Sequence, residues 1–72
     1  MIILINIKIL DKLELIYIDD DKPLYEIYPI FNRCSTTSEI TKDDVALDIS
    51  KSFKFYNIKN DDTLSVNYVI RN

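Results

Sequence analysis

The sequence of 72 residues contains no glycine, no histidine and no tryptophan, and it has a single cysteine. Without glycine there is no glycine-rich loop to cradle a phosphate group. Without histidine there is neither a histidine-based catalytic triad nor a histidine-containing zinc site. One cysteine excludes an internal disulfide and a four-thiolate metal site. These absences predict a protein that is not an enzyme and that holds no metal and no cofactor.

Basic residues are also scarce relative to acidic ones, nine against twelve, which gives a formal net charge of −3 at pH 7. A nucleic-acid-binding domain usually carries a basic patch, so this balance argues against a nucleic-acid partner. The apolar start of the chain is interrupted by Asn6 and Lys8, far short of the roughly 20 apolar residues of a membrane span. The single Cys34 fits a reducing compartment. We therefore expect a cytoplasmic or nuclear protein with protein partners and no membrane partner.

The length predicts one domain over residues 1–72, with one modest core. Its first 18 residues are rich in isoleucine and leucine, which favours a β-hairpin with a polar break at Asp11-Lys12. Because no glycine is present, Asp11 is the residue expected to accept a positive φ at the turn.

Two registers of this hairpin are open, and they differ in which side chains share the core face. A tight two-residue turn pairs Leu10 with Leu13 and places Ile16 and Ile18 with the odd-numbered isoleucines Ile3, Ile5, Ile7 and Ile9. A bulged turn places Leu13, Leu15 and Tyr17 there instead. In either register the second face is apolar as well, so it is expected to contact something.

Residues 19–31 carry the signals of a short helix. Three aspartates and Pro23 resemble a helix start, with an aspartate cap and proline at the first helical position. The buried stripe is then Leu24, Ile27 and Phe31. Pro29 should kink the helix or divide it into two pieces, because proline cannot donate the backbone hydrogen bond of a helix interior.

The second half predicts short strands at 39–42 and 45–49, joined by a turn at Asp43-Asp44, and a final strand at 63–70. The acidic pairs in this half are interpreted as solvated turns. The element order predicts an α+β fold, in which a mixed sheet of four to five strands packs on one short, proline-kinked helix.

The stretch from Tyr56 to Arg71 resembles the β-grasp fold of ubiquitin and its relatives. It combines Tyr56-Asn57-Ile58, a polar run to Asp62, Thr63-Leu64 and an alternating strand, and it aligns with ubiquitin without a gap. Upstream the likeness lies in apolar spacing at the positions Met1, Ile3, Ile5, Leu13, Leu15, Leu24, Ile27, Phe31, Leu47 and Phe53. The hairpin positions match without a shift, which favours the bulged register.

The resemblance implies two structural roles and two functional departures. Tyr56 is expected to bond nearby backbone through its hydroxyl, and Ile58 to fill the core under the same turn. The family's usual apolar recognition patch is altered at the matching positions Thr41, Ser65 and Val69, two of which are hydroxyl residues, with Asn67 between them. Arg71-Asn72 stands where conjugated relatives carry Gly-Gly, so we expect this chain, as written, not to be activated for conjugation.

In the bulged register, four aliphatic side chains point away from the helix: Ile2, Leu4, Ile16 and Ile18. Together with the exposed edge of the second strand, they form the predicted protein-binding surface. The function that this favours is a non-covalent protein-protein interaction module of ubiquitin-like fold. Two alternatives remain open: a modifier or sulfur carrier whose tail is missing from this chain, and an assembly domain that forms a homodimer through the second strand.

Overall fold

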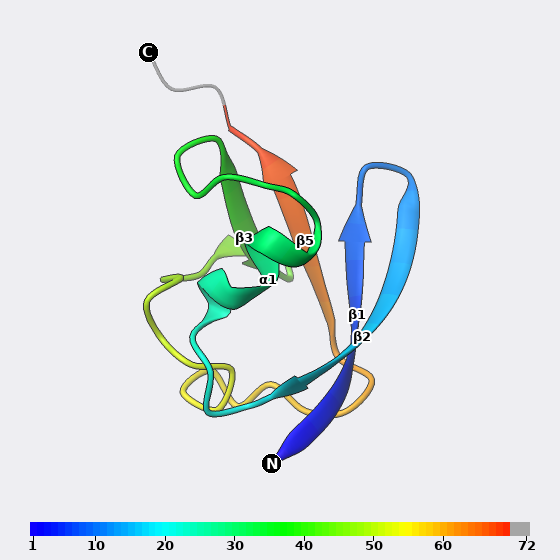
Figure 1. Ribbon diagram of the computed structural model, residues 1–72, viewed down its shortest axis with the longest axis vertical. Coiled ribbons are helices and arrows are strands. Elements are labelled where there is room, and N and C mark those ends of the chain that lie inside the picture. The colour runs from blue at the N-terminus through cyan, green and yellow to red at the C-terminus, as the bar shows by residue number, and fades with distance from the viewer. Residues whose placement is uncertain (70–72) are drawn as a thin grey trace.

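One mixed sheet of five strands, in the order β2-β1-β5-β3-β4, organises the computed structural model, which describes residues 1–69 (Figure 1). The strands are β1 (Ile2–Ile9), β2 (Lys12–Asp19), β3 (Ser38–Lys42), β4 (Val45–Ala46) and β5 (Thr63–Tyr68). β1 runs parallel to β5, and the other neighbouring strands are antiparallel. The predicted α+β fold with a mixed sheet is confirmed.

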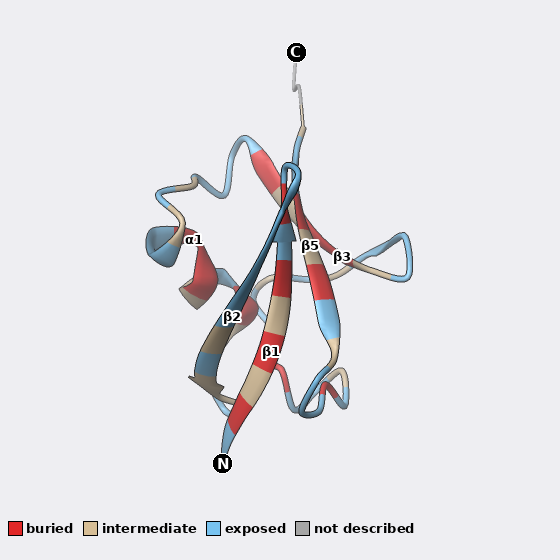
Figure 2. Cartoon of the chain, turned by 90° about the vertical axis from the view of Figure 1, so that its right-hand side faces the viewer, coloured by how far each residue is buried: buried red, intermediate tan, exposed pale blue. Residues whose placement is uncertain are grey.

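β1 supplies the middle of the core because its isoleucines alternate with other residues at the period of a strand. Ile3, Ile5, Ile7 and Ile9 face inward and are buried. The residues between them face the opposite side of the sheet, so β1 alternates between buried and less buried positions along its length (Figure 2). Parallel pairing with β5 adds Leu64 and Val66 to the same layer.

The favoured bulged register of the hairpin is wrong. Ile9 pairs with Lys12 around the two-residue turn Leu10-Asp11, so Ile5 lies opposite Ile16 and Ile3 opposite Ile18. The inward face is therefore the one expected for a tight turn, although the closing pair is Ile9 and Lys12 rather than Leu10 and Leu13. Both faces of β2 are apolar, so hydrophobic pattern alone did not decide between them.

The turn residue with a positive φ is Leu10, at 53°, and not Asp11 as expected. The two-residue loop requires a left-handed conformation at its first position, and Leu10 stands there because the pairing closes at Ile9. A leucine in this conformation is strained, since its Cβ crowds the following carbonyl oxygen.

The helical segment consists of a 3-10 turn, η1 (Leu24–Glu26), followed directly by α1 (Ile27–Ile30). The segment is thus in two short pieces as expected, but the boundary lies between Glu26 and Ile27 and not at Pro29. Pro29 is the third residue of α1, in the first turn, where a backbone N–H has no partner within the helix. The aspartate cap is wrong: Pro23 occupies the N-cap position of η1, and no side chain caps it. Asn32, at φ 54°, closes α1, with the backbone N–H of Arg33 donating to the carbonyl of Tyr28.

The helix packs on the inward face of the sheet, as Figure 2 shows from the side. Leu24 and Ile27 are fully buried, whereas Phe31 is half-buried at the margin. Tyr28, which the sequence pattern did not single out, is also buried and donates its hydroxyl to the carbonyl of Ser38 at 3.1 Å. The short strand β4 ends at Ala46, three residues before the predicted end, and Ile70 of the predicted last strand lies outside the described residues.

Candidate protein-binding surface

The outward face of the β1–β2 hairpin carries a cluster of apolar side chains. The register places Leu4 opposite Tyr17, Asn6 opposite Leu15, and Lys8 opposite Leu13. Opposite residues of an antiparallel pair share one face of the sheet, so these side chains project on the side away from α1. We call the apolar members of this set the hairpin face: Ile2, Leu4, Leu13, Leu15 and Tyr17.

Four members of the hairpin face are strongly exposed. Tyr17 retains 75% of its accessible surface, Leu15 63%, Leu13 62% and Ile2 60%, while Leu4 is half-buried. Scattered apolar residues are normal on a protein surface, whereas a contiguous exposed group of this kind makes the hairpin face a candidate interaction surface. The charged neighbours on this face, Lys8 and Asp19, lie at its two ends.

Two of the four binding residues predicted from the sequence lie on this face and two do not. Ile2 and Leu4 point outward as expected. Ile16 and Ile18 turn toward the helix side, where they are half-buried and pack against the core. Leu13, Leu15 and Tyr17 were missed as surface residues because the resemblance assigned Leu13 and Leu15 to the core. The signal that could have identified them is the two-residue turn at Leu10-Asp11.

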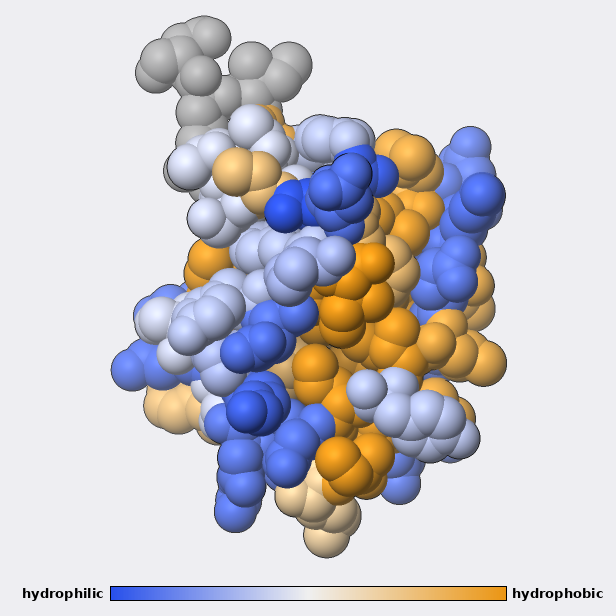
Figure 3. Space-filling view, viewed as in Figure 1, coloured by the Kyte–Doolittle hydropathy of each residue, from blue (hydrophilic) through white to orange (hydrophobic). Residues whose placement is uncertain are grey.

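The helix side of the molecule also exposes apolar surface. A band of hydrophobic side chains runs down the middle of this side (Figure 3). An open groove of about 520 Å³ lies between the hairpin and the helical segment, where Ile18, Pro29 and Ile30 meet the charged Lys22 and Glu26. The groove continues past the strand edge to Ile2 and Tyr17 of the hairpin face.

The positions of the family's usual patch are largely polar and bonded to neighbouring groups. Thr41 on β3 lies directly opposite Ser65 on β5, and Thr41 is buried. The side-chain amide of Asn67 donates to the hydroxyl of Thr41 at 3.1 Å. Val69, which is half-buried, donates its backbone N–H to the carbonyl of Thr37 at 2.8 Å. This region therefore offers no apolar platform comparable to the hairpin face.

Tyr56 and Ile58 have the structural positions that the resemblance implies. The hydroxyl of Tyr56 accepts a hydrogen bond from the backbone N–H of Asp48 at 2.7 Å, and Ile58 is buried in the core. The carboxylate of Asp48 accepts bonds from the hydroxyl and the N–H of Ser50, at 2.7 and 3.0 Å. These bonds stabilise the charged carboxylate and lower the pKa of Asp48.

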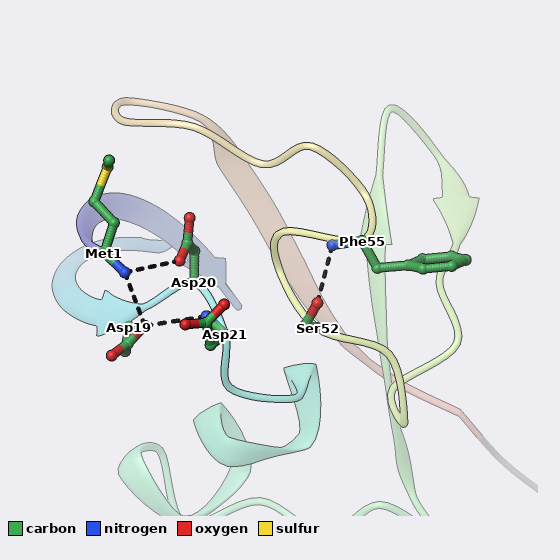
Figure 4. A network of polar contacts seen from close by, with 6 residues as sticks. All are labelled: Met1, Asp19, Asp20, Asp21, Ser52 and Phe55. Carbon is green, nitrogen blue, oxygen red and sulfur yellow. Dashed lines mark hydrogen bonds and ion pairs between the residues drawn. The ribbon is translucent and has the colours of Figure 1, made fainter.

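The acidic run Asp19-Asp20-Asp21 forms the end of β2 and the turn after it, and it binds the amino terminus (Figure 4). The Met1 ammonium donates to Asp20 at 3.1 Å and to Asp19 at 3.2 Å, which raises the pKa of the ammonium. Asp19 also accepts the backbone N–H of Asp21, and this bond and the ammonium lower the pKa of Asp19. The three carboxylates thus lie close together with a cation of the chain already among them.

Comparison with solved structures identifies the fold. The ubiquitin-like domain of Dsk2 from Plasmodium falciparum superposes with a TM-score of 0.83 at 16% identity, over 96% of this chain and all of that one. The N-terminal ubiquitin-like domain of the 4931431F19Rik protein gives a TM-score of 0.82 at 11% identity, over 99% of this chain and 78% of that one. No protein-family model matches the sequence, and a search of the curated proteins finds no match. No helix in residues 1–69 has the length and apolar character needed to cross a membrane.

Proposed function

We propose that this chain, which has the ubiquitin-like β-grasp fold, acts by binding other proteins non-covalently through the hairpin face and has no enzymatic activity. The observation that carries the proposal is the exposure of four large apolar side chains on one face of the hairpin. We place this binding in the cytoplasm or nucleus, in keeping with a single free cysteine.

The composition of the hairpin face suits a protein partner. Its centre is apolar and contains an aromatic ring, while Lys8 and Asp19 lie at its ends, which is the arrangement of an interface with a dry centre and a polar rim. Burying this centre requires no desolvation of a charged group, because the residue between Leu4 and Lys8 on this face of β1 is the neutral Asn6.

The polar character of Thr41, Ser65 and Asn67 supports a recognition mode that does not use this part of the sheet. An apolar side chain of a partner docked there would meet hydroxyl and amide groups and would displace the water that hydrates their exposed atoms, which is unfavourable. The expectation about conjugation depends on Arg71-Asn72, which lie outside the described residues, and the proposed binding mode does not use them.

Site-specific photo-crosslinking in cells tests the proposal. A benzophenone amino acid at position 17 samples the hairpin face, and the same group at Phe55, which is exposed outside the hairpin face, is the matched control. We expect discrete protein adducts from position 17 that are absent from position 55. Equal adduct patterns at the two positions, or none at position 17, would contradict the proposal.

A further inference from the structure

We propose that the hairpin face takes a second copy of this chain, and that the two copies pair edge to edge along β2. The inference rests on the proposed function and names the partner. β2 is the first strand in the sheet order, and within the described residues it pairs on one side only, with β1. Alternate backbone N–H and C=O groups of an edge strand are directed outward, ready to accept another strand.

A two-fold axis perpendicular to the sheet makes the two β2 strands antiparallel and keeps both hairpin faces on the same side. Under this symmetry each register is centred on one residue of β2, because opposite residues of an antiparallel pair share one face of the sheet. A register centred on Ile16 places Leu15 opposite the second copy's Tyr17, and by symmetry it places Tyr17 opposite the second copy's Leu15. Residues Leu15 and Tyr17 are exposed in the single chain, so the pairing covers apolar surface of both copies.

Charge selects this register over its neighbours. β2 begins at Lys12 and runs into the acidic residues Asp19 and Asp20, so its two ends have opposite charge. In the register centred on Ile16, Lys12 lies opposite the second copy's Asp20 at both ends. Moving the centre toward the turn, to Glu14, sets two glutamates against each other, and moving it to Tyr17 sets Glu14 against Asp20. Like charges directly opposite each other destabilise strand pairing.

The register centred on Leu15 is the remaining competitor. It places Leu13 opposite the second copy's Tyr17, but it also brings Asp11 opposite Asp19 and leaves Lys12 facing Ile18. Asp11 faces an aspartate in both registers, because the register centred on Ile16 sets it against the second copy's Asp21. The register centred on Leu15 is therefore disfavoured by the loss of the opposite-charge pairs between Lys12 and Asp20. The two registers differ in whether Tyr17 meets Leu15 or Leu13, and this difference can be measured.

Complementary charge variants test the pairing. Leu15→Lys and Tyr17→Glu each place a charge on an exposed position, so each chain should remain folded by circular dichroism. We expect the unmodified chain to have twice its 8.5 kDa mass in light scattering after size exclusion. Each variant alone should raise the dimer dissociation constant about tenfold or more. Mixing the two variants should restore the dimer, because the lysine introduced in one copy then meets the glutamate introduced in the other.

The mixture of Leu13→Lys with Tyr17→Glu is the matched control, because Leu13 faces Asp19 and not Tyr17 in the proposed register. Restoration by this mixture, and not by the first, would overturn the pairing. A chain that stays monomeric at about millimolar concentration would overturn the dimer. If that monomer still gives adducts with another protein from position 17, the proposed function stands; if those adducts are absent too, both proposals fail.

Discussion

Six residues in the described part of the chain have a positive φ, and five of them are asparagine or aspartate. These two residue types tolerate the left-handed conformation because their short polar side chains bond locally, so they take the turns that glycine would otherwise occupy. Leu10 is the exception, since its side chain has no polar group to compensate the strain.

Replacement of Leu10 should therefore stabilise the protein. Leu10→Gly relieves the crowding at Cβ, a cost of roughly 1–2 kcal/mol, but increases the entropy of the unfolded chain. We expect a net gain of about 0.5–1 kcal/mol in the free energy of unfolding, measured by urea denaturation. Leu13→Gly, at an exposed strand position with an ordinary φ, should be destabilising, and a gain of equal size there would contradict the explanation.

The hydroxyl of Tyr56, which accepts the backbone N–H of Asp48, gives a second prediction at the residue scale. Tyr56→Phe removes the acceptor of the Asp48 backbone N–H while keeping the ring packed against the core. The expected loss is about 1 kcal/mol in the free energy of unfolding. Tyr25→Phe removes a hydroxyl from an exposed ring and should leave the denaturation midpoint unchanged; equal losses in both variants would show that the Asp48 bond contributes nothing.

At the scale of the element, the β1–β2 hairpin shows what an apolar sequence leaves undetermined. The existence of both strands follows from their content of isoleucine and leucine on either side of a polar break, and the inward face of β1 follows from its alternating isoleucines. In β2 both faces carry large hydrophobic side chains: Ile16 and Ile18 point inward, and Leu15 and Tyr17 point outward. Only the length of the turn therefore decides which of the two sets faces the core. The resemblance to ubiquitin pointed to the wrong set because it was built on apolar spacing.

Two neighbouring residues of β2 test this assignment. Ile16→Glu buries a charge at the margin of the core and should cost about 2 kcal/mol in the free energy of unfolding. Leu15→Glu changes an outward side chain and, at a concentration where the chain is monomeric, should alter the free energy by no more than about 0.5 kcal/mol. If urea denaturation shows a larger loss for Leu15→Glu than for Ile16→Glu, the bulged register is correct and this assignment is wrong.

At the scale of the whole molecule, the sequence predicted the fold more completely than it predicted which residues form the outward hairpin face. The mixed sheet with β2 at its edge, the two short pieces of the helical segment and the positions of Tyr56 and Ile58 agree with the sequence-based predictions. Of the four residues predicted to bind a protein, only Ile2 and Leu4 lie on the outward face, and their binding stays a prediction. The residues that form a surface depend on the register, whereas a core tolerates any apolar residue of suitable size. The predicted aspartate cap of the helix is wrong because Asp19 and Asp20 instead bind the Met1 ammonium, which is far from them in sequence.

The stability of the whole molecule should fall in acid. The pKa of Asp19 and the pKa of Asp48 are both lowered in the folded protein. A lowered pKa means that each carboxylate stabilises the fold above the ordinary aspartate value and that this contribution disappears as the pH falls through the folded value, below about pH 4. The urea midpoint should drop over this range, and Asp48→Asn should flatten the drop; a midpoint that does not change between about pH 5 and about pH 2 would contradict both assignments.

The central claim is that the hairpin face is where this ubiquitin-like domain meets its partner, and methyl NMR measures it most directly. Signals of Leu13 and Leu15, which are exposed on this face, are followed as the isotope-labelled chain is concentrated and then placed in cell extract. Val45, exposed on β4 at the opposite end of the sheet, is the internal control. The account predicts shifts or broadening at Leu13 and Leu15 while the Val45 signals stay sharp; changes confined to Val45, or no change at all, would contradict it.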